Sequence, residues 1–304
     1  MLAAIDATYT RRGRIVGGMN TLLRRQALAA TIMLTCAIAG AIAPAAAAEL
    51  SFEEGVARDP VGGVLYREQH WIRHRDGVPL ERLTLYRCAD GTAFARKQVD
   101  YRRSRLAPEF ELMDARSGYR EGLRRTGGGP TLFVRERTGA QESARALAPQ
   151  ALVADAGFDE FIRRHWLTLV AGQRLPIEFA VPSRLRSLGF TVQRTGAVST
   201  IAGEPALTFR LALGGILRWI APHIEVSYGQ KSRRLLRFEG LGNLRDDRSA
   251  GQLVARIDFA SPPRAVTEGD RRPAADTPLS ACSTGRRTDG RIPARTGVEI
   301  AASD

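Results

Sequence analysis

Residues 206–213 read ALTFRLAL, in which a large apolar side chain stands at every second position. Two later stretches repeat this period of two: HIEVSY at 223–228 and LVARIDF at 253–259. A strand with one dry face and one wet face shows this alternation, and antiparallel sheets are built from such strands. The three stretches therefore predict an antiparallel sheet.

Shorter runs of strand-forming residues precede these stretches, and turn dipeptides such as Asp76-Gly77 and Asp90-Gly91 separate them. Asp-Gly between two such runs favours a hairpin because glycine tolerates a positive φ. Many strands joined by short turns predict a meander rather than parallel strands with helical crossovers. The expected strands lie at 64–74, 79–88, 93–101, 109–116, 118–125 and 131–137.

The period changes to that of a helix between Phe158 and Val170, where apolar residues recur every three or four positions and charged residues fill the other face. This pattern predicts an amphipathic helix near 156–171, which Asp155 could cap and Gly172 could end. Such a helix needs an apolar surface to cover. The predicted fold is therefore mainly β: a curved antiparallel sheet or unclosed β-barrel with one amphipathic helix packed against its concave face.

An export signal is predicted at residues 19–48. It has a short basic start, MNTLLRR, then an uncharged stretch, and it ends in three alanines, so we expect cleavage after Ala48. We expect translation to start at Met19, with residues 1–18 an over-long gene start. An uncleaved anchor, a lipoprotein cleaved at Cys36 and twin-arginine export remain alternatives. The expected location is periplasmic, with no integral membrane segment after cleavage.

The C-terminal residues 261–304 contain no Phe, Trp or Tyr. A segment so poor in large apolar groups cannot offset the entropy of ordering it, so we predict a disordered tail after a single β domain at 49–260. Cys36 falls in the predicted signal, which leaves Cys88 and Cys282. Because Cys282 lies in the predicted tail, no disulfide framework is expected.

The chain has a formal net charge of +13, and Lys97 and Lys231 are its only lysines. The arginines are scattered among acidic residues, which is typical of a solvated surface rather than of a binding face. No nucleic-acid-binding motif is present, so no nucleic-acid partner is expected.

No catalytic motif stands out. The sequence lacks Gly-x-Ser-x-Gly, His-Glu-x-x-His, Cys-x-x-Cys and a phosphate-binding glycine loop with lysine, so neither an enzyme nor a cofactor is expected. His70 and His74 stand four apart in a predicted strand, roughly 13 Å from each other, which is too far for both to bind one metal ion. Asp246-Asp247 is interpreted as a solvated turn, and no metal site is predicted.

The layout of a signal peptide, an antiparallel sheet and an amphipathic helix resembles the LolA/LolB-type lipoprotein carriers over roughly residues 50–260. The segment RRLLRFEG at 233–240, followed by Asn243, is similar to exported proteobacterial proteins of unassigned function. The carriers are unclosed β-barrels in which helices cap an apolar cavity for acyl chains. The resemblance implies such a cavity here, but it rests on no diagnostic motif, so no binding residue is carried over.

The leading hypothesis is a non-enzymatic periplasmic binder of an apolar or amphipathic ligand, such as a lipid or acyl chain. The alternative is a structural or interaction protein of the envelope, with a packed interior and a protein partner. The connection 214–222, GGILRWIAP, is unusually apolar and is expected either in the core or at the mouth of a cavity. The candidate cavity residues are Phe158, Ile162, Trp166, Leu207, Phe209, Leu211, Trp219, Ile224, Val226, Tyr228, Phe238 and Ile257.

Overall fold

The computed structural model describes residues 49–127, 129–148, 151–213, 224–246 and 251–282, all within the unit Ala45–Asp304. Its helical elements are α1 (Gly157–Arg164), α2 (Trp166–Val170), the 3-10 helix η1 (Pro182–Arg184) and α3 (Glu268–Asp276). Its strands are β1 (Glu49–Arg58), β2 (Val64–Arg75), β3 (Val78–Arg87), β4 (Ala93–Asp100), β5 (Glu109–Asp114), β6 (Tyr119–Thr126), β7 (Gly129–Arg135), β8 (Ser143–Ala146), β9 (Leu152–Ala154), β10 (Leu175–Val181), β11 (Arg186–Ile201), β12 (Glu204–Leu213), β13 (Ile224–Gly229), β14 (Leu235–Arg245), β15 (Gln252–Asp258) and β16 (Arg264–Ala265).

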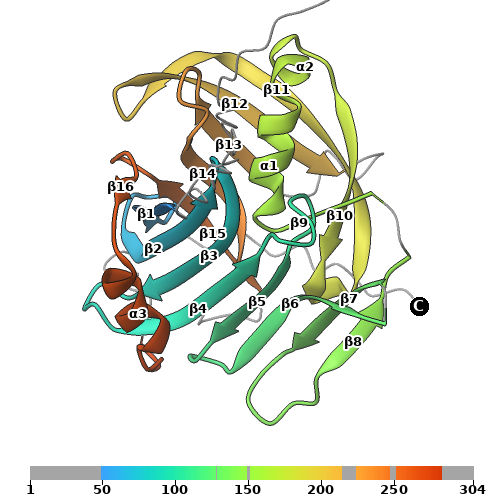
Figure 1. Ribbon diagram of the computed structural model, residues 1–304, viewed down its shortest axis with the longest axis vertical. Helices are drawn as coiled ribbons and strands as arrows, with labels where there is room; N and C mark the ends of the chain where they lie inside the picture. The colour runs from blue at the N-terminus through green and yellow to red at the C-terminus, as the bar shows by residue number, and fades with distance from the viewer. Residues whose placement is uncertain (1–48, 128, 149–150, 214–223, 247–250, 283–304) are drawn as a thin grey trace, which may run out of the picture. The chain divides into compact units, whose positions relative to one another are not determined.

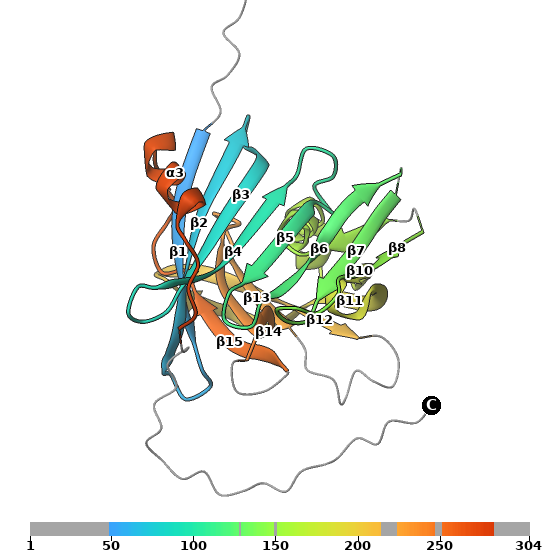
Figure 2. The same ribbon diagram turned by 90° about the horizontal axis from the view of Figure 1, so that it is seen from below.

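One 16-stranded sheet contains all the described strands, in the order β8-β7-β6-β5-β4-β3-β2-β1-β15-β14-β13-β12-β11-β10-β9, with β16 paired to β1. The pairing is antiparallel except between β9 and β10. The sheet curls into a cup, and its two end strands, β8 and β9, do not pair with each other (Figures 1 and 2). The predicted fold class, a curved and unclosed antiparallel sheet, is therefore confirmed.

The hairpin turns follow the predicted chemistry. Asp76 and Gly77 connect β2 to β3 with φ values of 52° and 71°. Positive φ at both central residues gives a turn whose twist matches that of the flanking strands. The sequence did not predict β11, because its residues 196–200 are exposed and therefore show no alternation between a dry and a wet face.

The predicted helix is present as α1 and α2, which are separated by His165 at φ −101° and ψ 19°. Its apolar side chains pack on the inner face of β10–β13, and Figure 1 shows α1 lying across the cup. The N-cap residue is Ala156, with no side-chain cap, so the expected role of Asp155 is wrong. Gly172 ends α2 at φ 86°, as predicted.

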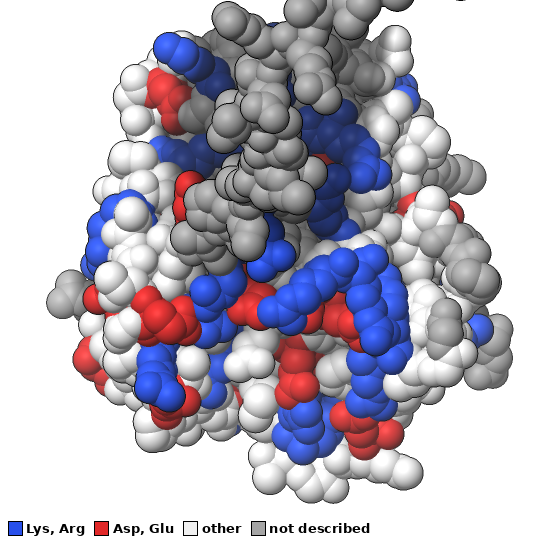
Figure 3. All heavy atoms as spheres, viewed as in Figure 1, with Lys and Arg blue, Asp and Glu red and all other residues white. Residues whose placement is uncertain are grey.

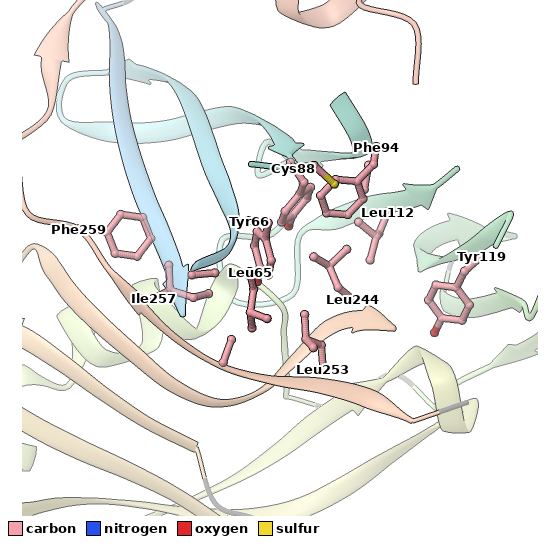
Figure 4. Close-up of a cluster of buried hydrophobic side chains, with 14 of the residues drawn as sticks. Leu65, Tyr66, Cys88, Phe94, Leu112, Tyr119, Leu244, Leu253, Ile257 and Phe259 are labelled. Atoms are coloured by element: carbon pink, nitrogen blue, oxygen red, sulfur yellow. The ribbon is translucent and has the colours of Figure 1, made fainter. Parts of the chain in front are cut away.

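A second core lies where the two halves of the sheet meet, between β1–β6 and β14–β15. Tyr66 and Phe94 pack edge to face from β2 and β4, with ring centroids 6.1 Å apart. Leu244, Leu253 and Ile257 approach them from β14 and β15 (Figure 4). Because β1 pairs with both β2 and β15, it joins the two halves into one hydrogen-bonded sheet.

The prediction of a disordered tail is wrong for residues 264–282. Strand β16 pairs with β1, and α3 begins with a capping box formed by Thr267 and Asp270. Ala274 of α3 is buried in a cluster with Trp71, Leu83 and Leu85. The composition of the segment did not predict this structure, because the apolar surface that orders the segment belongs to β2 and β3.

A disulfide joins Cys88, which follows β3, to Cys282, with 194 residues of sequence separation. The expectation that these cysteines would not pair is therefore wrong, and its error follows from the tail prediction. The remainder of the predicted tail, 283–304, lies outside the described residues, as does the predicted signal. Within the described ranges, no helix is both long and apolar enough to cross a membrane.

Candidate functional site: a cavity with two unlike walls

The curved sheet forms an open cavity of about 1080 Å³. Cavities that hold small ligands measure roughly 300–1,000 Å³, so this one has room for a ligand of substantial size. Inward-facing residues of β2–β6 line one side, and residues of β10–β15 line the other. Residues of α1 line the cavity between these two sides.

The wall formed by β10–β15 is apolar. On β12 and β13 the inward positions are those predicted by the alternation of the sequence, and Leu211 and Ile224 are register partners across these strands. Val226 of β13 is likewise opposite Phe238 of β14. We call this surface the apolar wall, and its main side chains are Phe179, Phe190, Leu211, Ile224, Val226, Leu235, Phe238 and Ile257.

The structure divides the predicted cavity residues into two groups. Those that line the cavity are Phe158, Leu211, Ile224, Val226, Phe238 and Ile257. Those that lie in the packed cluster under α1 and α2, and not among the lining residues, are Ile162, Trp166, Leu207, Phe209 and Tyr228. The helices fill this end of the cup, since the rings of Trp166 and Phe209 lie 5.6 Å apart. Trp219 lies outside the described residues.

The opposite wall, from β2–β6, carries charged and polar side chains on its inward positions. We call it the charged wall. Burying a charge is costly unless it is paired and hydrogen-bonded, so a wall of this kind requires a network. Its principal side chains are Glu68, His70, Arg82, Lys97 and Glu121, and they are joined by Asp155 before α1, Asp159 within α1 and Asn243 of β14.

Asp159 forms the first node of this network. Its Oδ2 lies 3.2 Å from a guanidinium nitrogen of Arg82, and its Oδ1 accepts a hydrogen bond of 2.6 Å from the hydroxyl of Tyr228. Burial alone would raise the pKa of Asp159, but Arg82 and Arg163 lower it below the ordinary value of an aspartate. The carboxylate therefore stays charged, and it ties α1 to β3 and β13.

Asp155 forms the second node, in the turn before α1. Its Oδ1 accepts hydrogen bonds of 2.9 Å from Lys97 Nζ and 2.9 Å from Asn243 Nδ2. Burial alone would lower the pKa of Lys97, but Asp155 raises it above the ordinary value of a lysine. The backbone of Asp155 has φ 44°, a left-handed conformation that aspartate adopts more readily than most residues.

Glu121 and Glu68 complete the charged wall. Glu121 accepts a hydrogen bond of 2.7 Å from Tyr119, and burial, followed by the charge of Asp155, raises the pKa of Glu121 to about 7. Glu68 lies 2.9 Å from the ring nitrogen Nε2 of His70 and accepts a hydrogen bond of 3.3 Å from Tyr66. The wall thus places several carboxylates close together, away from bulk water.

The charged wall was not predicted from the sequence, because the alternation pattern identifies a strand by one apolar, buried face. On β2, the inward positions carry Tyr66, Glu68 and His70, so the side facing the cavity is not the apolar one. One signal was available: Lys97 is one of only two lysines in an arginine-rich chain. His70 and His74 both line the cavity from β2. The described ranges contain no group of three or more His, Cys, Asp or Glu side chains arranged to hold a metal ion.

The outer surface differs from the cavity. Over β4–β7, basic and acidic side chains stand next to one another (Figure 3). Pairs such as Arg120–Glu111, at 2.6 Å, and Arg124–Glu142, at 2.9 Å, are partly exposed. Exposed pairs of this kind contribute little to stability or binding. On this face, the basic side chains therefore lie beside acidic partners.

No protein-family model and no curated protein matches this chain. Among solved structures, it is similar to a β-barrel-like protein of the domain of unknown function DUF1849 from Brucella abortus. That similarity covers 72% of this chain and 98% of that chain, at 8% identity and a TM-score of 0.43. It is a similarity of arrangement, and no ligand or activity is carried over from it.

Proposed function

We propose that the protein is a non-enzymatic binder of an amphipathic ligand with an acyl chain, such as a lipid. The observation that carries this proposal is the pairing of unlike walls around one cavity of about 1080 Å³. An acyl chain would lie against Leu211, Ile224 and Phe238 of the apolar wall, where its burial is favourable. The polar end of the ligand would face the charged wall.

The proposed location is the periplasm. Disulfides persist in oxidising compartments, including the bacterial periplasm, and the Cys88–Cys282 disulfide fits such a compartment. The predicted signal peptide ends immediately before Glu49, the first residue of β1. These two observations are independent, since one comes from composition and the other from geometry.

The proposal of a binder rather than an enzyme rests on the way the charged groups are arranged. Asp159 is held by Arg82 and Tyr228, and Asp155 is held by Lys97 and Asn243. We propose that carboxylates held in this way position the polar end of the ligand.

The experiment is a titration of the purified mature protein with a fluorescent fatty acid analogue. Ile224→Trp places a large ring on the apolar wall and should weaken binding about tenfold or more, because it occupies the volume of the chain. Ser199→Trp is the matched control, since Ser199 is exposed on β11. Absence of saturable binding, or equal affinity in the wild type and Ile224→Trp, would refute the proposal.

A second candidate is the envelope interaction protein. The observation that favours it is the end strand β8, whose residues Ser143–Ala146 are all exposed and which pairs only with β7. An unpaired strand edge can add a strand from a partner. Ala144→Pro, in an otherwise unchanged cavity, should abolish capture of such a partner while leaving ligand binding intact.

A further inference from the structure

The cavity contains a region where carboxylates outnumber bases. Glu68, Glu121 and Asp155 line it together with one lysine, Lys97, while Arg82, which also lines the cavity, is paired with Asp159 at 3.2 Å. We call this region the carboxylate end. Its excess of acid is opposite to the charge of the whole chain, which is +13. His70 adds a ring beside Glu68, at 2.9 Å.

A second observation shows that this region has unused hydrogen-bonding capacity. The side chain of Asp155 is only 3% exposed, and both of its hydrogen bonds, from Lys97 and Asn243, go to Oδ1. Its other oxygen, Oδ2, is buried and has no hydrogen-bond partner among the described residues. A buried carboxylate oxygen without a partner costs free energy, and a donor on a ligand would recover it.

The side chains of the carboxylate end are close enough to influence one another. After burial, the charge of Asp155 is the largest influence that raises the pKa of Glu121, which reaches about 7. Asp155 and Glu68 both favour the charged form of Lys97. Lys97 donates to one oxygen of Asp155, and the hydroxyl of Tyr119 donates to Glu121. The charges of Arg245 and Lys97 act in the opposite direction to Asp155 and lower the pKa of Glu121. A further positive charge placed here would stabilise the ionised wall.

We propose that the carboxylate end receives an ammonium group, so that the ligand is an amphipathic amine whose apolar chain lies along the apolar wall. This inference rests on the proposed function and specifies its ligand class. An ammonium group is a compact cation with three donors, which matches a set of separate carboxylate oxygens. An anionic headgroup would instead meet Glu68, Glu121 and Asp155 in a site of low dielectric, where like charges repel strongly.

The test compares two probes with the same chain and opposite charge, decylamine and decanoate, by isothermal titration at neutral pH. Decylamine should bind about tenfold more tightly than decanoate, because hydrogen bonds between charged groups are the stronger ones. Glu121→Gln should reduce that preference about threefold or more, because it removes one negative charge at the site. Asp155→Asn is the second variant. Provided that it folds, it should also reduce the preference for decylamine about threefold or more.

Glu111→Gln is the matched control, because Glu111 faces outward on β5, where it pairs with Arg120 at 2.6 Å. It should leave the preference unchanged. Decanoate binding as tightly as decylamine, or a preference that survives Glu121→Gln, would overturn the ammonium site while leaving the acyl cavity standing. Absence of binding by either probe would overturn both this inference and the proposed function.

Discussion

Removal of residues 264–304 tests whether the C-terminal segment is part of the folded domain. This truncation deletes β16, α3 and Cys282, so it breaks the disulfide to Cys88 and uncovers the outer face of β2 and β3. If composition alone decided the outcome, the thermal midpoint would be unchanged. The structure predicts a large loss.

The magnitude has two parts. A disulfide that closes a loop of 194 residues has an entropic upper limit of about 5 kcal/mol and more commonly contributes about 2–4 kcal/mol. Leu83 and Leu85 are 1% and 0% exposed in the cluster that includes Ala274. Uncovering one side of each should cost about 1 kcal/mol per residue, since full burial contributes about 1.5–3 kcal/mol. The truncation should therefore cost about 4–6 kcal/mol.

The assay is thermal unfolding followed by circular dichroism. For a domain of this size, a loss of about 4–6 kcal/mol lowers the midpoint by roughly 10–20 °C. The control is a chain that ends at Cys282, which keeps every contact described for this segment. Cys282→Ser separates the two parts, because it removes the disulfide and leaves α3. A truncated protein that melts within about 3 °C of the control would refute the reasoning.

Phe209→Ala should destabilise the protein by about 3–5 kcal/mol in urea unfolding, because Phe209 is fully buried in the cluster under α1. Phe238→Ala, at the cavity, should cost less. Equal losses of stability in the two variants would contradict the division into core and cavity. Glu121→Gln should stabilise the protein relative to the wild type as pH rises. The folded-state pKa of Glu121, about 7, lies above its ordinary 4.5, so the folded state holds this proton longer and wild-type stability falls across that interval. The difference between pH values of about 5 and 8 should reach about 1–3 kcal/mol, and parallel curves for the two proteins would contradict it. Asp159→Leu should cost about 3–5 kcal/mol because it leaves Arg82 buried without its partner, whereas the double variant with Arg82→Leu should recover part of the loss in a mutant cycle.

Much of the fold could be predicted from local patterns. The strand β12 alternates because one of its faces contacts the core and the other contacts water, and that local difference is present in the sequence. Strand β11 was not predicted, because much of it is exposed on both faces and its sequence therefore does not alternate. The position of Cys282 was beyond local reasoning, since its partner lies in another part of the chain.

The candidate site was predicted only in its apolar half. Ile224 and Val226 were identified by alternation, and the structure places them on the cavity. Lys97, Asp155 and Asn243 meet from β4, a turn and β14, so only the folded arrangement shows that they share hydrogen bonds. Charged residues on a strand ordinarily indicate its solvent side, and the inward face of β2–β6 reverses that rule.

The position of β1 at the centre of the sheet has a consequence for how the chain acquires its structure. Val56 pairs with Asp258, so a strand from the beginning of the domain must find one from its end. Pairings of such long sequence separation form slowly. If the chain is exported as proposed, its first strands emerge well before β15, and β1 then presents an open edge that can recruit another chain. On that proposal, we expect this protein to depend on a holding chaperone until its last strands arrive.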